Sequence, residues 1–366
     1  SEYEPHHGHH RLAVLHAQIS SGLMRKRDFC IRPMILEGVA FGAEVVGFSI
    51  REALLRGCKI GSEEVEQLRR AVSDHSFLLF RGQSDLHDNG AGLSCDELVA
   101  FGQWFGRGHL HSSHRVHPRA QHEDVFRVSN NPDEGCFEKG GVGTGGFHSD
   151  GHFLPNVYSN AVYQIVQVQE GDKGHTLFAD YGRAVAWLAA EEPEELLRLK
   201  RLHVFSDISG VLHPLVHRHP LTGKHVLLLG GVAGALEVFE GTAETLMSSG
   251  VPPGTLASAR DIEVKTRDSW KPLELMRTTM GEVPLLAVKQ LNKDEIAELI
   301  KRLQHLLSRT DMHYQHLWQS GDLIVTDNLA VAHKAAKGAG DLSCGQRILH
   351  RVTVAGSHRI EGLLAC

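Results

Sequence analysis

The chain has 366 residues, of which 42% are hydrophobic and 22% are charged, a composition that excludes wholesale disorder. Lys and Arg number 38 against 44 Asp and Glu, so the formal net charge is −6 and no basic excess predicts nucleic-acid binding. No apolar run reaches the roughly 18 residues of a membrane-spanning helix.

The first predicted elements are short strands and capped helices. Between residues 31 and 48, short apolar runs alternate with glycine, which predicts two strands. Ser62 opens an amphipathic helix, and residues 77–80 form a short apolar strand. Ser94 and Glu97 have the spacing of a capping box, which predicts the start of another helix.

A long segment without periodicity follows, at residues 106–146. It is rich in His, Asn, Pro and Gly and is too long to be a passive connection, so we expect a loop that acts as a functional lid. Beyond it, residues 157–168 and 177–178 predict strands and residues 191–199 a helix. Residues 213–229 predict a hairpin around a Pro-Leu-Thr-Gly turn.

The last third of the chain predicts one helix and three strands. Asn292 and Glu295 form a second capping box before an apolar stripe of helical period. Strands are predicted at residues 314–318, 323–326 and 348–354. Together with the earlier elements, these predict one mainly β domain with helices packed outside it.

Cysteine and histidine usage points to a reducing compartment and to metal chemistry. The six cysteines are widely scattered and none forms a C-x-x-C pair, which favours free thiols and a cytoplasmic location. Histidine occurs 26 times, and imidazole suits metal binding and proton transfer. The glycines of residues 141–146 match G-x-G-x-x-G, but no helix start follows them, so we reject a dinucleotide site.

Two H-x-D triplets begin at His122 and His148. In an extended segment, residues two apart point the same way, so His148 and Asp150 would aim an imidazole and a carboxylate at one point. A distant histidine, His333, would complete a set of two histidines and one carboxylate, which leaves adjacent positions open on Fe(II). Zinc accepts the same ligands, so these residues alone leave the metal open.

Two arginines lie four residues apart on the last predicted strand. Arg347 and Arg351 would face the same side of that strand. Guanidinium groups directed into a β core are costly unless they pair with anions. The partners would be either carboxylates of the protein or carboxylates of small molecules, which arginine binds in a bidentate manner.

The order of motifs over residues 31–357 resembles the taurine dioxygenase / 2,4-dichlorophenoxyacetate dioxygenase (TauD/TfdA) family of Fe(II)/2-oxoglutarate enzymes. The matching segments are Phe77–Gln83, Phe147–Phe153, Gly174–Ala179, His213–Lys224, Trp318–His333 and Arg347–Arg351. The resemblance implies a double-stranded β-helix, also called a jelly roll or cupin-like fold, with helices outside it. Residues 1–30 would be an N-terminal extension and residues 358–366 a tail.

The resemblance implies a catalytic metal site and a co-substrate site. His148, Asp150 and His333 would be the iron ligands, and Thr176 and Arg347 would hold the distal carboxylate of 2-oxoglutarate. The cofactors would be Fe(II), 2-oxoglutarate and O2.

The substrate contacts implied by the resemblance involve a different set of residues. Arg351 falls where taurine-type members hold the substrate anion and where other members support the co-substrate pocket. Three further positions would contact substrate: His111, His114 and Thr144.

The implied reaction converts 2-oxoglutarate and O2 to succinate and CO2 while hydroxylating a small organic molecule, with an anion as one candidate. Desaturation, cyclisation, or C–S or C–O cleavage with the same cofactors stay open. A catalytically silent jelly-roll binding protein is a third alternative, but both arginines and the ligand set argue against it because unused buried charges destabilise a core. We expect no nucleic-acid or membrane partner and a homo-oligomer, either a dimer or a tetramer.

Several positions depart from the family pattern. Phe147 replaces the usual Trp before the first ligand histidine, and Thr326 and Leu329 replace a common Trp and Arg. These changes predict a pocket shaped differently from that of taurine-type members. Because Asp150 is a carboxylate, the chain does not match the halogenase variants, which have Gly or Ala there to leave room for chloride.

Overall fold

The structure is a computed structural model. It describes residues 29–84, 92–107, 116–136, 142, 145–154, 156–171, 173–206, 211–230, 236–240, 289–358 and 360–362. Three predicted substrate positions, His111, His114 and Thr144, lie outside the described residues, as do the predicted extension up to residue 28 and parts of the predicted lid. No helix among the described residues is long and apolar enough to cross a membrane.

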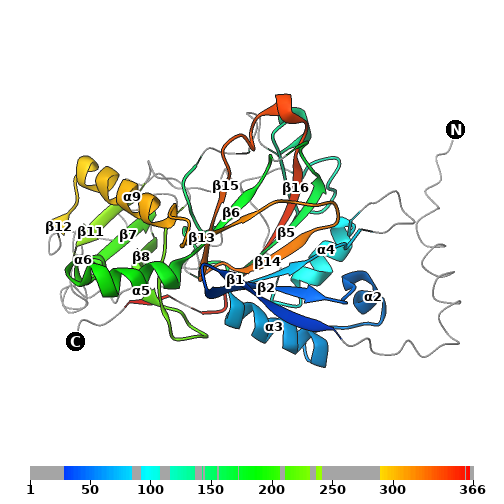
Figure 1. Cartoon of the computed structure of the whole chain (residues 1–366), viewed down its shortest axis with the longest axis horizontal. Coiled ribbons are helices and arrows are strands. Elements are labelled where there is room, and N and C mark those ends of the chain that lie inside the picture. Colours follow the sequence, from blue (N-terminus) through cyan, green and yellow to red (C-terminus); the bar gives the residue numbers. More distant parts are fainter. Residues whose placement is uncertain are drawn as a thin grey trace, which may run out of the picture.

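The largest sheet has seven strands. Their spatial order is β1 (Cys30–Leu36), β2 (Val39–Val46), β3 (Phe77–Phe80), β14 (Leu323–Asp327), β5 (Asn160–Gln167), β16 (Ile348–Val354) and β4 (Phe126–Ser129). Strand β2 runs parallel to β3, and the other neighbours are antiparallel. Strands from both ends of the sequence therefore meet at the centre of the sheet, where β14 lies between β3 and β5 (Figure 1).

A three-stranded sheet packs against the large one. Its strands are β13 (His313–His316), β6 (Thr176–Asp180) and β15 (Val331–Ala335), in the order β13-β6-β15. The apolar layer between the sheets includes Phe77 of β3, Tyr163 of β5 and Phe178 of β6. The ring of Phe178 lies 5.7 Å from that of Phe77 and 6.0 Å from that of Tyr163. These two facing sheets confirm the predicted jelly roll.

Helices cover the large sheet on its other side. They are α2 (Ile50–Leu55), α3 (Glu63–His75) and α4 (Cys95–Gly102) (Figure 1). The predicted apolar stripe of α3 is buried, because Val65 and Leu68 face the sheet. The capping box of Ser94 and Glu97 is present, with both reciprocal hydrogen bonds formed.

The remaining elements lie at the other end of the molecule (Figure 1). The helices are α5 (Tyr181–Glu191), α6 (Pro193–Leu199) and α9 (Lys293–Leu307). One sheet contains β12 (Lys289–Gln290), β11 (Leu236–Glu240), β7 (Leu202–Ser206) and β8 (Val211–Pro214), and another contains β10 (His225–Leu227), β9 (Val216–Arg218) and β17 (Glu361–Gly362). Strands β9 and β10 form the predicted hairpin, and the capping box of α9 is present.

Two sequence predictions need correction. The helix predicted at residues 191–199 begins at Pro193, and α5, which precedes it, was missed although its buried residues follow a helical period. The segment 106–146 is not only loop, because it contains β4 and a short 3₁₀ helix, η1 (Pro132–Glu134). A second 3₁₀ helix, η3 (Leu342–Cys344), precedes β16.

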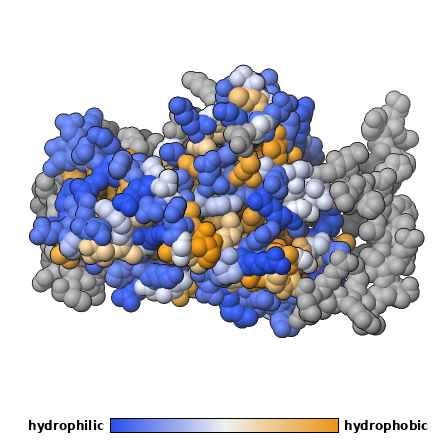
Figure 2. Space-filling view, in the orientation of Figure 1, coloured by the Kyte–Doolittle hydropathy of each residue, from blue (hydrophilic) through white to orange (hydrophobic). Residues whose placement is uncertain are grey.

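The molecular face in Figure 2 is mostly hydrophilic, with apolar residues in separate smaller areas. Strand β17 lies within the predicted tail and pairs with β9, so part of that tail joins a sheet. The predicted domain limits stay a prediction.

Candidate active site

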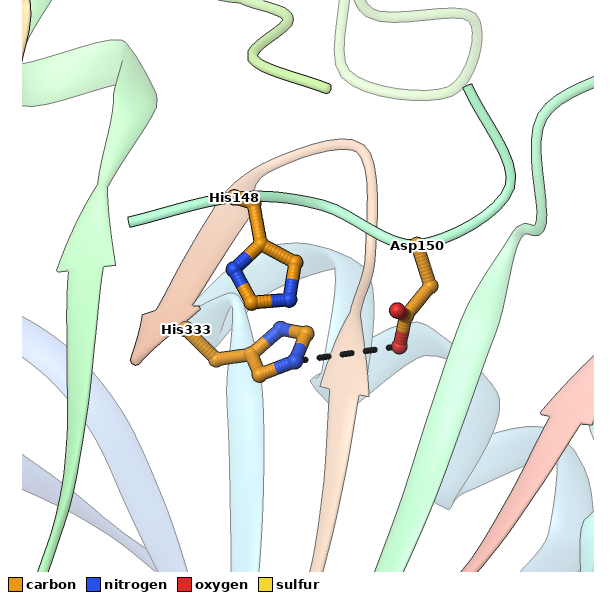
Figure 3. A group of neighbouring side chains, drawn as sticks. All are labelled: His148, Asp150 and His333. Atoms are coloured by element: carbon orange, nitrogen blue, oxygen red, sulfur yellow. Dashed lines mark ion pairs between the residues drawn. The ribbon is translucent and has the colours of Figure 1, made fainter. Parts of the chain in front are cut away.

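Three predicted ligands converge at one point. The ligand atoms of His148, Asp150 and His333 all lie within 4.8 Å of one another, and Figure 3 shows the three side chains converging. No other group of three His, Cys, Asp or Glu side chains comes together in this way among the described residues.

Backbone pairing brings the two histidines together. His333 lies on β15, and His148 lies in the segment before β5. The two residues pair with each other in an isolated antiparallel bridge. The His148 amide donates to the His333 carbonyl at 3.1 Å, and the His333 amide donates back at 2.8 Å. The ring centroids are consequently 4.3 Å apart.

The carboxylate is positioned by a buried amide. Asn328, which is 1% exposed, accepts a hydrogen bond from the Asp150 amide at 3.1 Å and donates to the Asp150 carbonyl at 2.9 Å. The residue before Asn328, Asp327, is held in turn, because His219 of the hairpin contacts its carboxylate at 3.0 Å.

The turn after Asp150 has a backbone conformation that favours glycine. Gly151 has φ 78°, and a Cβ atom there would lie 2.6 Å from the Tyr158 ring. The turn after Asp150 therefore requires glycine.

The second ring nitrogen of each histidine has a partner. His148 Nδ1 lies 2.9 Å from the carbonyl oxygen of Gly146, which can only accept, so Nδ1 carries the proton and Nε2 is free to bind a metal. His333 Nδ1 lies 3.3 Å from the Tyr163 hydroxyl, and its Nε2 faces Asp150 at 3.8 Å. Burial lowers the pKa of His333 to about 3, so its imidazole is neutral at neutral pH.

This donor set fits Fe(II). Two neutral imidazoles and one carboxylate are the ligands of the facial triad in non-heme iron oxygenases. Partners of the outer nitrogens, such as the Gly146 carbonyl, fix the orientation of ligand histidines in metal sites. The three residues therefore have the chemistry and the proximity that one such ion needs.

Arg351 contacts the carboxylate of this group. Its Nη1 donates to Asp150 Oδ2 at 2.8 Å, and its guanidinium carbon lies 4.8 Å from the Phe126 ring centroid. Its Nε is buried and has no hydrogen-bond partner among the described residues. One of the two partners expected for this arginine, a carboxylate of the protein, is thus present.

Arg347 is a buried cation. It is 4% exposed, its Nε donates to the Gly174 carbonyl at 2.8 Å, and its Nη2 donates to Thr176 Oγ1 at 3.1 Å. No carboxylate in the described part of the chain forms an ion pair with Arg347. Burial lowers its pKa to about 10, which still leaves the group charged at neutral pH. A buried cation without an anion fits a small-molecule carboxylate.

The Thr176 hydroxyl is oriented by its neighbours. Trp318 Nε1 donates to Thr176 Oγ1 at 2.9 Å, in addition to the bond from Arg347. Because the oxygen accepts twice, the threonine proton stays available for another acceptor. Arg347 and Thr176 together thus offer a cation and a hydroxyl donor to one anion.

Other sequence predictions fall outside this site. In the second H-x-D triplet, His122 Nδ1 accepts a hydrogen bond from the Asp124 amide at 3.0 Å, as in a local turn, and His122 does not belong to the candidate metal group. The sequence did not indicate that Tyr163 contacts a ligand histidine, because Tyr163 lies in an apolar run typical of a core strand. The sequence placed Asn328 and Trp318 in a motif without giving either a role.

Comparisons with known proteins agree with this geometry. The sequence model of the family described as "Taurine catabolism dioxygenase TauD, TfdA family" matches residues 36–353. Pentalenolactone F synthase of Streptomyces arenae is 26% identical, with 82% of this chain and 90% of that protein covered. The alpha-ketoglutarate-dependent 2,4-dichlorophenoxyacetate dioxygenase of Cupriavidus pinatubonensis is 25% identical, with 86% and 94% covered. A taurine dioxygenase structure from Burkholderia xenovorans, 20% identical over 91% of this chain and 93% of that chain, superposes with a TM-score of 0.56 and shows the shared fold.

Proposed function

The chain belongs to the TauD/TfdA family, whose members are Fe(II)- and 2-oxoglutarate-dependent dioxygenases, and we propose that it hydroxylates a small organic molecule with His148, Asp150 and His333 as iron ligands. The observation that carries the proposal is the convergence of these three side chains within 4.8 Å. The enzyme class requires Fe(II), 2-oxoglutarate and O2.

In the proposed reaction, 2-oxoglutarate, O2 and R–H give succinate, CO2 and R–OH, and bound Fe(II) supplies the redox chemistry that couples these changes. Arg347 and Thr176 hold the distal carboxylate of 2-oxoglutarate. Their support is the buried guanidinium, which pairs with no carboxylate in the described part of the chain, and the threonine proton left free by two incoming hydrogen bonds.

Arg351 is proposed to serve the site in two ways. Its Nη1 orients the Asp150 carboxylate, which is already within 2.8 Å. Its unpartnered Nε can donate to an anion of the co-substrate or of the substrate. His111, His114 and Thr144 remain proposed substrate contacts.

The relatives name different substrates or products, a 2,4-dichlorophenoxyacetate dioxygenase and a pentalenolactone F synthase among them, so the proposal names no single molecule. Desaturation, cyclisation and C–S or C–O cleavage stay alternatives at the same site. We also propose one catalytic domain over residues 31–357 and a cytoplasmic homo-oligomer. The five described cysteines, which are free thiols, support the reducing compartment.

The test is succinate formation from 2-oxoglutarate by the purified chain supplied with Fe(II) and O2, with and without a panel of small organic acids. The proposal expects slow succinate release that requires iron and rises with a true substrate. Full activity in a His148→Ala variant would contradict the assigned ligands.

A further inference from the structure

We infer that Gln304 of α9 is a positioning residue of the metal site, an inference that rests on the proposed role of His148 as a ligand. The Gln304 amide holds the main chain of Phe147, the residue directly before His148. Gln304 lies outside the segments whose motifs match the family pattern, so no sequence signal pointed to it. It acts on residues 146–150, called the ligand segment below.

The ligand segment has a metal face and a buried face. His148 and Asp150 direct their side chains toward His333 (Figure 3). Residues two apart in an extended segment point the same way, so Phe147 and Ser149 point to the other face, and they are 1% and 0% exposed. Phe147 packs in the same apolar cluster as the buried leucines of α9. Helix α9 therefore supports the ligand segment from behind.

The two main-chain edges of the ligand segment are held differently. On one edge, His148 and His333 exchange two backbone hydrogen bonds. The amide and carbonyl of the preceding residue, Phe147, point to the opposite edge, where no strand in the described part of the chain pairs with it. A buried peptide group needs partners, and at this edge they have to come from a side chain.

Gln304 takes the place of the missing strand. The Phe147 amide donates to Gln304 Oε1 at 2.6 Å, and Gln304 Nε2 donates to the Phe147 carbonyl at 2.8 Å. A side-chain amide has the donor and the acceptor of a peptide group, so it can make the pair of bonds that a neighbouring strand would make. Position 147 is thus fixed through both of its main-chain polar groups.

The Gln304 amide also packs against Gly146. A Cβ atom at residue 146 would lie 2.4 Å from Gln304 Cδ, so the amide lies directly on the backbone there. The Gly146 carbonyl oxygen in turn lies 2.9 Å from His148 Nδ1. Gln304 therefore touches both residues that precede His148, and because Phe147 is almost fully buried, water cannot replace a lost partner.

Gln83 supplies a matched control. Its Oε1 accepts from the Ile50 amide at 2.9 Å, and its Nε2 donates to the Phe48 carbonyl at 2.9 Å. Gln83 is half-buried, as Gln304 is, and Ile50 begins α2, outside the ligand segment. Gln83→Met therefore removes the same pair of bonds from a different part of the main chain.

The first experiment measures the Co(II) affinity of the full chain by competition with a chelator, after urea unfolding has shown that each variant is folded. Gln304→Met keeps a long side chain without either bond and should bind Co(II) about 10- to 100-fold more weakly than the wild type. Gln304→Asn, whose amide is one methylene too short to reach both groups, should also bind more weakly. Gln83→Met should bind like the wild type.

Two results would overturn the inference. One is wild-type affinity in folded Gln304→Met and Gln304→Asn. The other is an equal loss of affinity in Gln83→Met, which would mean that the loss of any such backbone contact loosens the metal site.

The second experiment records the visible absorption of bound Co(II), which depends on the arrangement of its ligands. At saturating Co(II), Gln304→Met should differ from the wild type in band position or intensity, whereas Gln83→Met should match the wild type. A spectrum of Gln83→Met that differs as much as that of Gln304→Met would contradict a specific role for Gln304.

The His148→Ala variant separates this inference from the proposed function. If His148→Ala binds Co(II) as well as the wild type, the ligand assignment fails. If His148→Ala loses binding while both Gln304 variants keep wild-type affinity, only the role of Gln304 fails.

Discussion

Arg351 and Asp150 are joined by a 2.8 Å hydrogen bond between guanidinium Nη1 and carboxylate Oδ2, so the one acidic member of the candidate metal group is held by a partly buried cation. The main chain of Asp150 is held by two hydrogen bonds to the Asn328 side chain. Asp150 is thus held through both its side chain and its main chain.

Arg351→Met should lower metal affinity about 10- to 100-fold, because the ligand carboxylate loses the donor that orients it. The measurement is Co(II) competition with a chelator. Arg347→Met serves as the control, since it removes a buried arginine whose side-chain hydrogen bonds run to Gly174 and Thr176 and not to Asp150. Unchanged affinity in Arg351→Met would show that the ion pair does not orient the ligand.

Arg347→Gln should raise the apparent KM for 2-oxoglutarate strongly while it spares metal affinity. Loss of a hydrogen-bonded charge pair in a desolvated site costs about 2–5 kcal/mol, or roughly 30- to 4,000-fold in affinity. Succinate release in the absence of substrate should fall with it. Steady-state kinetics at varied 2-oxoglutarate measure both effects, and a KM equal to that of the wild type would rule out Arg347 as the carboxylate anchor.

Asn328→Ala should destabilise the metal-free protein and weaken metal binding together. The substitution removes two part-buried hydrogen bonds to the main chain of Asp150, and a desolvated polar group that loses its partner costs about 1–3 kcal/mol. Urea unfolding and chelator competition measure the two effects. Asn131→Ala is the control, because it removes a side-chain bond to a backbone amide in η1, outside the ligand group. A stability loss without any loss of metal affinity would mean that Asn328 supports only the fold.

His217 should make the protein sensitive to acid. It is fully buried, neither ring nitrogen has a hydrogen-bond partner within the described ranges, and burial lowers its pKa to about 3. Because the folded pKa lies below the unfolded value of about 6.5, the unfolded chain binds more protons between these values. The free energy of unfolding should therefore fall as the pH drops below about 6.5, by about 2 kcal/mol at pH 5 for this one residue.

The corresponding measurement is urea unfolding of the metal-free chain at neutral pH and at pH 5. His217→Leu should reduce the loss on acidification, whereas His358→Gln, at an exposed histidine, should leave it as in the wild type. An equal loss in His217→Leu and the wild type would show that other groups cause the acid sensitivity.

The sequence predicted those elements and ligands whose structure depends only on residues a few positions apart. Capping boxes begin α4 and α9, and the H-x-D triplet places two donors on one side of an extended segment. The pairing of β14 with both β3 and β5 had no such local signal, because it joins segments more than a hundred residues apart. The contact of Tyr163 with His333 depends on that pairing and on the facing sheet. The residues next to Tyr163 in the sequence therefore indicate only an apolar strand.

We propose that His148, Asp150 and His333 together hold one Fe(II). The most direct measurement is the amount of Fe(II) bound per chain after anaerobic loading and gel filtration, for the wild type, His148→Ala, His333→Ala and His122→Ala. We expect one iron per chain in the wild type and in His122→Ala, and almost none in the other two variants, because two remaining ligands hold a divalent ion poorly. One iron per chain in either His148→Ala or His333→Ala would contradict the assignment of the ligands.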